Sequence, residues 1–108
     1  MNKHNVLTGA AVLLTVFYAA SFAHAADPAA GKALYETTCV ACHGPAGISV
    51  APVYPNLGGQ KEPYLVEQLK AYRDGTRANP IMAPMAKGLN DTQIANLAAY
   101  LTAPPRLR

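Results

Sequence analysis

The sequence predicts an all-α fold in which three main helices are connected by two ordered loops. Three segments carry apolar residues at helical spacing, around residues 28–38, 62–73 and 90–101. The two segments between them, 44–60 and 76–85, are interrupted by glycine or proline, as is typical of loops. No run of alternating apolar and polar residues indicates a β-strand, so we expect helices alone to build the core.

The first 25 residues have the pattern of an export signal. Lys3 gives a basic start, residues 6–20 are apolar and uncharged, and Ala23-His24-Ala25 is a small-x-small cleavage site. The apolar segment is shorter than the roughly 20 residues that span a bilayer. We therefore expect residues 1–25 to be a signal peptide that is cleaved after Ala25, with an uncleaved membrane anchor as the alternative.

Removing residues 1–25 from the 108-residue chain leaves 83 residues, 26–108, which suffice for one small domain. A chain this short has little core to bury and often needs a staple such as a cofactor. Without Lys3, eight of the nine basic side chains remain beside six acidic ones. This near balance of charge favours neither a nucleic acid nor an acidic membrane surface as partner.

The first helix is predicted over residues 28–38, because Asp27 is a good N-cap and Pro28 suits the first helical position. Helical spacing places four residues on one side: Ala30, Ala33, Leu34 and Thr37. Gly31 lies inside this helix, where a glycine costs on the order of 1 kcal/mol relative to alanine. Either another helix approaches closely at Gly31, or the glycine is simply tolerated.

The helix leads into Cys39-Val40-Ala41-Cys42-His43, which is the attachment pattern of c-type haem. Each cysteine would add across a vinyl group, and the histidine would become the proximal iron ligand. The alternatives are a redox-active dithiol, which needs a βαβ scaffold, and a structural zinc site, which needs four ligands. The sequence shows neither a βαβ pattern nor a second ligand cluster. We therefore expect one covalently attached haem c, which also provides the staple.

The segment after the motif, residues 44–60, predicts an ordered loop, because apolar residues are interspersed among its glycines and prolines. A haem-ligating histidine normally donates its other ring N–H to an acceptor, and a proline carbonyl of this loop is a candidate. The next helix is predicted over residues 62–73 and is ended by Asp74-Gly75. Its inward stripe is expected to be core and not a binding feature: Tyr64, Leu65, Gln68, Leu69 and Tyr72.

Residues 76–85 are predicted to be irregular and contain Met82 and Met85. Methionine is ordinarily a core filler, but these two lie in a proline-stiffened segment and not on an apolar helix face. A thioether at the sixth position of the iron favours the reduced state, whereas an open position admits small ligands. The other histidines, His4 and His24, fall in the expected signal peptide, which excludes bis-histidine ligation.

The last helix begins at Asn90, which is its expected N-cap, with Gln93 as the capping-box partner. Its apolar residues keep helical spacing: Ile94, Leu97, Ala98 and Leu101. Pro104-Pro105 ends it. The haem motif thus follows the first helix, and the two methionines precede the last one.

The mature segment carries a specific combination of motifs, at residues 39–44, 55–60, 64–65, 68–69, 73–77, 82–85, 89–91 and 94–100. In this combination it resembles the class I cytochromes c, especially small bacterial periplasmic ones and the domain repeated in their dihaem relatives. The resemblance implies a cytochrome c fold over residues 26–108, wrapped around one haem. It also implies that Gly31 and Tyr35 contact the last helix around Tyr100.

The residues that match the cofactor site of this family are Cys39, Cys42, His43, Pro55 and Met82. By resemblance, the two cysteines are the thioether anchors and the adjacent histidine is the proximal iron ligand. The carbonyl of Pro55 orients the ring of that histidine. Met82 occupies the axial position of the family, seven residues ahead of Leu89, and Met85 is the fallback.

The resemblance implies a periplasmic one-electron carrier with a His/Met-ligated haem, not an enzyme, and a monomer without stable membrane insertion after signal removal. The expected partners are redox proteins: a membrane oxidase, a reductase or a periplasmic dehydrogenase. Apolar residues in 48–54 and 81–85 would surround an exposed haem edge and dock them. One alternative is a haem subunit of a larger periplasmic oxidoreductase. Another is a peroxidase or small-ligand sensor, for which no distal acid–base histidine remains.

Overall fold

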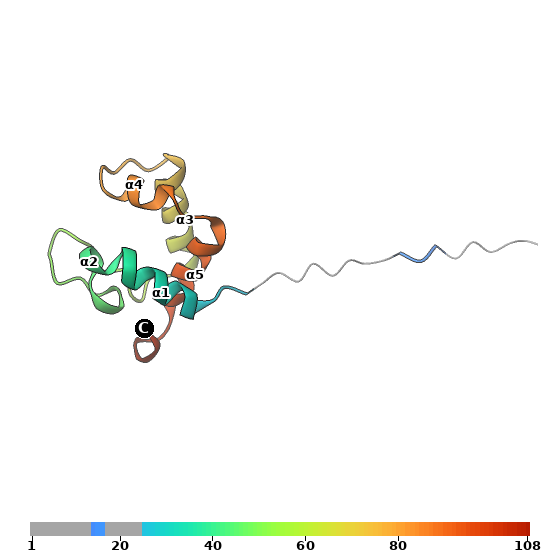
Figure 1. Ribbon diagram of the computed structural model, residues 1–108, viewed down its shortest axis with the longest axis horizontal. Helices are drawn as coiled ribbons and strands as arrows, with labels where there is room; N and C mark the ends of the chain where they lie inside the picture. Colours follow the sequence, from blue (N-terminus) through green and yellow to red (C-terminus); the bar gives the residue numbers. More distant parts are fainter. Residues whose placement is uncertain (1–13, 17–24) are drawn as a thin grey trace, which may run out of the picture.

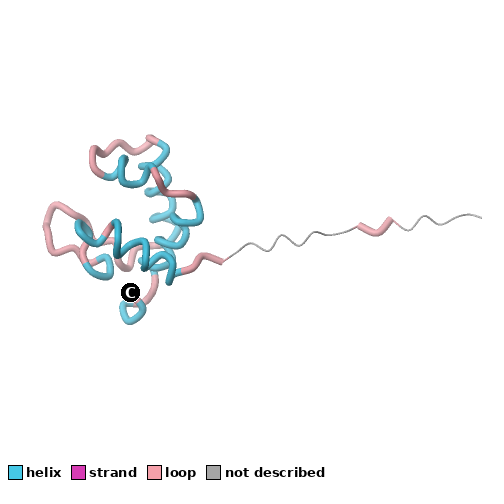
Figure 2. The backbone as a smooth tube through the Cα atoms, viewed as in Figure 1, coloured by secondary structure: helices cyan, strands magenta, loops and turns pink. Residues whose placement is uncertain are grey.

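The computed structural model describes residues 14–16 and 25–108 (Figure 1). The helices are α1 (Pro28–Thr38), α2 (Val40–His43), α3 (Glu62–Asp74), α4 (Met82–Lys87) and α5 (Asp91–Thr102), with short 3-10 turns at Pro45–Gly47 and Pro105–Leu107. Figure 2 shows helices and loops and no strand across these residues, which confirms the all-α prediction. Most of the expected signal peptide, residues 1–25, lies outside the described residues, so it stays a prediction.

The core is formed where α1 crosses α5. The Tyr35 ring packs against the Tyr100 ring, with centroids 5.3 Å apart and planes tilted by 54°. A Cβ at position 31 would collide with the carbonyl oxygen of Asn96, so Gly31 lets the two backbones touch. This contact confirms that the glycine serves a close helix approach. The buried cluster around it consists of Tyr35, Leu65, Leu97, Ala98, Tyr100 and Leu101.

The buried side of α1 is the one that the resemblance implies. Gly31 and Tyr35 are buried, whereas Ala30, Ala33 and Thr37 are exposed and Leu34 is partly buried. The helix packs through its smallest residue, which brings backbone against backbone, and not through a row of alanine methyl groups.

Side-chain caps begin α1 and α5, as the sequence predicts. The carboxylate of Asp27 accepts hydrogen bonds from the amides of Ala29 (2.9 Å) and Ala30 (3.2 Å). At α5, the Asn90 side chain accepts from the Gln93 amide at 2.8 Å, and the Gln93 side chain accepts from the Asn90 amide at 3.0 Å. Both capping arrangements satisfy amides that a helix leaves without a partner.

The prediction that residues 76–85 are irregular is wrong in its last part, because α4 begins at Met82. The side-chain oxygen of Asn79 accepts hydrogen bonds from the amides of Ile81 (2.9 Å) and Met82 (2.8 Å), which supports the first turn. Pro84 is tolerated there because the first turn of a helix needs no amide donor from it. The methionines thus lie on a short helix.

The described residues contain no helix that is both long and apolar enough to cross a bilayer. Figure 1 shows α1 and α2 on one side of an opening and α3 and α4 on the other, with α5 joining the two sides. The fold therefore presents the Cys-x-x-Cys-His segment and the methionine-bearing helix across from each other.

Gly31→Ala is expected to destabilise the protein by about 1–3 kcal/mol, because the added methyl group overpacks the contact between α1 and α5. Helix propensity alone predicts the opposite sign, a gain of about 1 kcal/mol. Denaturant unfolding of the haem-loaded protein measures the change. Ala33→Gly at an exposed site of the same helix is the control and should lose about 1 kcal/mol. A stabilised Gly31→Ala variant contradicts the close contact.

Candidate haem site

A cavity of about 350 Å³ lies between the two sides of the molecule. Its walls are mostly apolar and include Leu34, Leu57, Leu69, Ile81, Leu89 and Leu97. Arg77 is the one residue with a permanent charge among the described residues that line it. Its guanidinium donates to the Gln68 side chain at 2.6 Å and lies 4.6 Å from the centre of the Tyr72 ring. An apolar disc with carboxylate groups, such as haem, suits these walls.

Helix geometry brings the three reactive side chains of the motif into this cavity. Cys39 ends α1 and is the N-cap of α2, and its carbonyl accepts from the amides of Cys42 (3.3 Å) and His43 (3.0 Å). Residues three and four apart lie on one face of such a turn. All three side chains accordingly line the cavity. The spacing therefore places two sulfurs and one imidazole on a single wall.

The ring of His43 is held in one orientation. Its Nδ1 lies 2.9 Å from the carbonyl oxygen of Pro55, and the residue is 6% exposed. Because a carbonyl only accepts, Nδ1 carries the hydrogen, and in the neutral ring this leaves the Nε2 lone pair free to bind a metal. Pro55 is the proline to which the resemblance assigned this role, and its carbonyl is the one that the fold brings to the ring.

Burial makes Cys39 a poor candidate for the reactive thiol of a redox-active pair. Burial raises the pKa of Cys39 to about 11, with a smaller contribution from the charge of Cys42. Reactive Cys-x-x-Cys pairs need a lowered pKa, so Cys39 stays a thiol at neutral pH. Within the described part of the chain, no three His, Cys, Asp or Glu side chains cluster as metal ligands. These facts argue against the dithiol and the zinc alternatives and fit covalent haem attachment.

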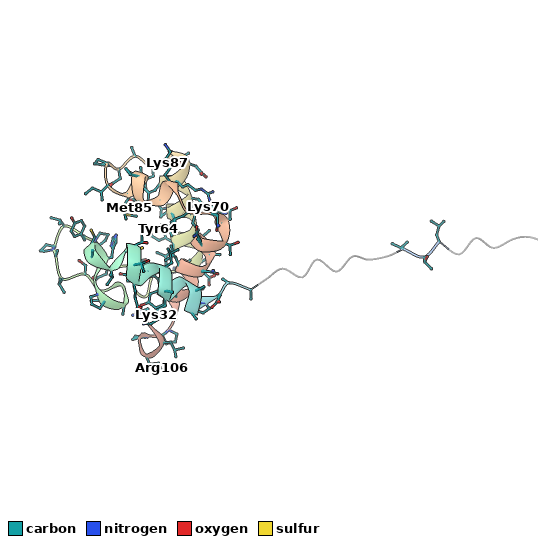
Figure 3. All side chains as sticks on the ribbon, in the orientation of Figure 1. Lys32, Tyr64, Lys70, Met85, Lys87 and Arg106 are labelled. Atoms are coloured by element: carbon teal, nitrogen blue, oxygen red, sulfur yellow. The ribbon has the colours of Figure 1, made fainter. Side chains whose placement is uncertain are left out.

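Both candidate methionines line the cavity from α4, across the opening from α2 (Figure 1). Met82 is partly buried, whereas Met85 is 44% exposed and lies at the rim with Tyr64 (Figure 3). A ligand that closes an iron site needs to be shielded from water, which favours Met82. Either thioether supplies a soft sulfur donor that suits haem iron.

The apolar stripe of α3 has a different role from the predicted one. All five of its residues line the cavity: Tyr64, Leu65, Gln68, Leu69 and Tyr72. Leu65 alone among them is also fully buried in the protein core. Periodicity shows that a helix face is apolar, but it does not show whether protein or a cofactor covers that face.

Two residues of the site, Asn79 and Arg77, were not singled out from the sequence, and Tyr35, which was expected only at the contact with α5, has a second role. The Tyr35 hydroxyl donates to the Gly44 carbonyl at 2.6 Å in a buried position and so fixes the end of α2. Burial raises the pKa of Tyr35 to about 12, so the hydroxyl keeps its proton. Asn79 supports the start of α4, and Arg77 places a positive charge in the cavity wall. The Asn79-Pro80 dipeptide is a local signal for a turn and points to the first of these two.

The comparisons with known proteins agree with this site. The family model described as cytochrome c matches residues 28–103. The chain is 51% identical over 82 residues to cytochrome c-554(548) of Halomonas halodenitrificans, covering 73% of this chain and 98% of that protein.

Two solved structures are similar. Cytochrome c4 of Acidithiobacillus ferrooxidans has a TM-score of 0.66 and 33% identity, covering 76% of this chain and 52% of that one. Thiosulfate dehydrogenase from Marichromatium purpuratum has a TM-score of 0.67 and 40% identity, covering 74% of this chain and 20% of that one. The chain therefore spans about half of the first structure and a fifth of the second.

Asn79→Ala is expected to fray the start of α4 and to cost about 1 kcal/mol, because two amides lose their acceptor. Hydrogen exchange of the Met82 amide and denaturant unfolding measure the effect. Asn79→Asp keeps the acceptor and is the matched control, for which wild-type exchange is expected. Equal exchange in wild type and Asn79→Ala shows that the cap has no such role.

Proposed function

The chain belongs to the cytochrome c family, and we propose that it is a periplasmic one-electron carrier with a single His/Met-ligated haem. Membership of the family establishes a haem c electron carrier. The residues proposed to hold the haem are Cys39 and Cys42 as thioether anchors and His43 and Met82 as iron ligands. One observation carries this assignment: these side chains line one apolar cavity, with the His43 ring already oriented by Pro55.

The protein contributes shielding and orientation. Haem, when bound, supplies an iron that gains or loses one electron. The apolar walls would shield most of a bound haem from water, and Pro55 holds the ring of His43 in one orientation. A thioether from Met82 would be the second iron ligand and would favour the reduced state.

A carrier fits the cavity better than a peroxidase or sensor. Among the described residues that line the cavity there is no carboxylate and no histidine besides His43. Peroxide chemistry needs an acid–base group beside the reacting oxygen, and these residues are the ones that most often serve. The cavity therefore holds a cofactor without equipping it for bond-making.

A second candidate function is a carrier domain within a larger periplasmic oxidoreductase. It is favoured by the similarity to a fifth of the chain of a thiosulfate dehydrogenase structure. The same haem site serves both roles, which differ in whether the domain diffuses. We propose the free carrier, because the chain matches nearly the full length of the Halomonas protein. The export pattern in residues 1–25 supports the periplasmic location and release from the membrane.

A docking surface for redox partners is proposed at the rim of the cavity. Large apolar side chains are exposed at the cavity-lining residues Val53, Tyr64, Ile81 and Met85 and, in the loop that contains Val53, at Ile48 and Val50. Val53 and Ile81 line the cavity and are 79% and 52% exposed, so they border its mouth from opposite sides. An exposed apolar rim of this kind suits brief contact with an oxidase, reductase or dehydrogenase.

Substitution of each methionine tests the ligand assignment. Met82→Ala is expected to abolish the Met-to-iron charge-transfer band and to let carbon monoxide bind the reduced protein, because the sixth position opens. Met85→Ala should keep the charge-transfer band and should not bind carbon monoxide. Visible spectra of both redox states measure this. The reverse pattern assigns Met85, and rapid carbon monoxide binding by the wild type favours a sensor or peroxidase.

Val50→Asp is expected to lower the rate of electron transfer to a protein partner about tenfold, which corresponds to about 1.4 kcal/mol of lost docking energy. Val50 is 91% exposed, does not line the cavity, and lies three residues before the cavity-lining Val53. Stopped-flow oxidation of the reduced protein by membranes from its source bacterium measures this rate. Oxidation by ferricyanide, a small molecule that needs no docking surface, is the control and should be unchanged. Ala33→Asp on α1 is the control for charge. Equal loss in both variants contradicts a specific surface.

A further inference from the structure

Arg73 connects the end of α3 with the start of α5. Its Nη1 donates to a carboxylate oxygen of Asp91 at 2.7 Å and to the carbonyl oxygen of Leu89 at 3.3 Å, and its Nε donates to Asp74 at 2.8 Å. The Arg73 side chain is 20% exposed, whereas that of Asp91 is 70% exposed. One guanidinium thus joins three acceptors, two of which follow α4 in the chain.

The segment between these attachment points carries the methionines. It leaves α3 at Gly75, which has a φ of 85°, and returns at Asn90, the N-cap of α5. Residues 75–90 therefore form a loop around α4 that is pinned beside both of its ends by one side chain. Pinning the ends of a loop reduces the conformations available to everything between them.

The contacts of Arg73 lie outside the cofactor cavity. Neither Arg73 nor Asp91 is among the cavity-lining residues, whereas Leu89 is. Lys70 on the same helix points away from the opening that Met85 borders (Figure 3) and lies 3.9 Å from Asp91. The Leu89 carbonyl is therefore the point at which this outer polar cluster reaches the wall of the haem site.

We propose that Arg73 is a positioning residue that acts as a clasp on residues 75–90 and sets how readily Met82 gives way to an incoming ligand. This inference rests on the proposed Met82 ligation for its effect at the iron, but the clasp itself does not depend on that assignment. Opening the segment would lift Leu89 and α4 from the cavity together, because Leu89 is one of the attachment points and α4 directly precedes it.

The clasp differs from an ordinary exposed ion pair in its number of hydrogen bonds. An ordinary pair contributes little, because solvent screens it and two long side chains must be ordered. Asp74 and Asp91 are also more than half exposed, but the guanidinium of Arg73 donates to both carboxylates and to the Leu89 carbonyl, so one ordered side chain makes several charge-assisted hydrogen bonds. The hydrogen bonds from Arg73 lower the pKa of both Asp74 and Asp91, so both carboxylates are charged at neutral pH.

Imidazole binding to the oxidised, haem-loaded protein tests the effect on ligand exchange. Arg73→Gln is expected to raise the affinity for imidazole about fivefold. Without the guanidinium, less free energy is needed to move residues 75–90 away from the cavity and let imidazole reach the iron. Arg73→Lys keeps the charge but not the fork and should give a smaller rise. Adding Asp91→Asn to Arg73→Gln should have little further effect, as expected for residues in one network.

Lys32→Gln is the matched control, because it removes the same charge and breaks the 2.7 Å ion pair between Lys32 and Glu36 on α1. Its imidazole affinity should stay within about twofold of the wild type, as for an exposed pair. An equal rise in Lys32→Gln, or no rise in Arg73→Gln, overturns the proposed control of ligand exchange.

Hydrogen exchange separates this inference from the ligand assignment. In Arg73→Gln the amides of residues 82–89 should exchange faster while those of α1 stay as in the wild type, whichever methionine binds the iron. If Met82→Ala keeps the charge-transfer band, the proposed ligation fails, and faster exchange in residues 82–89 still supports the clasp. Unchanged exchange there, or an equal increase in α1, overturns it.

Discussion

The crossing of α1 over α5 at Gly31 is the contact on which the other elements depend. The missing Cβ lets the α1 backbone reach the Asn96 carbonyl, and one turn later Tyr35 packs against Tyr100. The hydroxyl of the same tyrosine holds the carbonyl of Gly44, directly after the haem-binding motif. A single helix crossing thereby sets both the core and the direction in which His43 faces.

The two sides of the haem cavity are secured by different forces. On the histidine side the motif is continuous with α1, and His43 is buried and oriented by Pro55. On the methionine side, α4 is a six-residue helix that contacts α3 and buries Ala86, and Asn79 and Arg73 add polar contacts to its segment. Polar contacts near the surface are weaker than buried packing. The proposed ligand His43 is therefore expected to be held more firmly than the proposed ligand Met82.

Local signals predicted the parts of the structure that local interactions determine. The caps at Asp27 and Asn90 and the Cys-x-x-Cys-His turn depend on neighbours a few residues away, and the helices follow the predicted ranges closely. The start of α4 was missed because its prolines indicate a loop, and the Asn79-Pro80 dipeptide indicates a turn without showing that Asn79 caps a helix. In the sequence, Arg73 looks like an ordinary exposed residue at the end of a helix. Its role could not be predicted, because its partner Asp91 is 18 residues away.

The amide of Asp27 donates to the Asn96 side chain at 2.8 Å, so the residue that introduces the first long helix touches the middle of the last one. The end of α5 lies roughly 10 Å further along its axis, at 1.5 Å per residue. A unit whose entry and exit are this close can be fused head to tail with a second copy, or circularly permuted, through a short linker that leaves its interior unchanged. Gene duplication thus has a direct structural route from one redox centre to a pair of them in a single polypeptide.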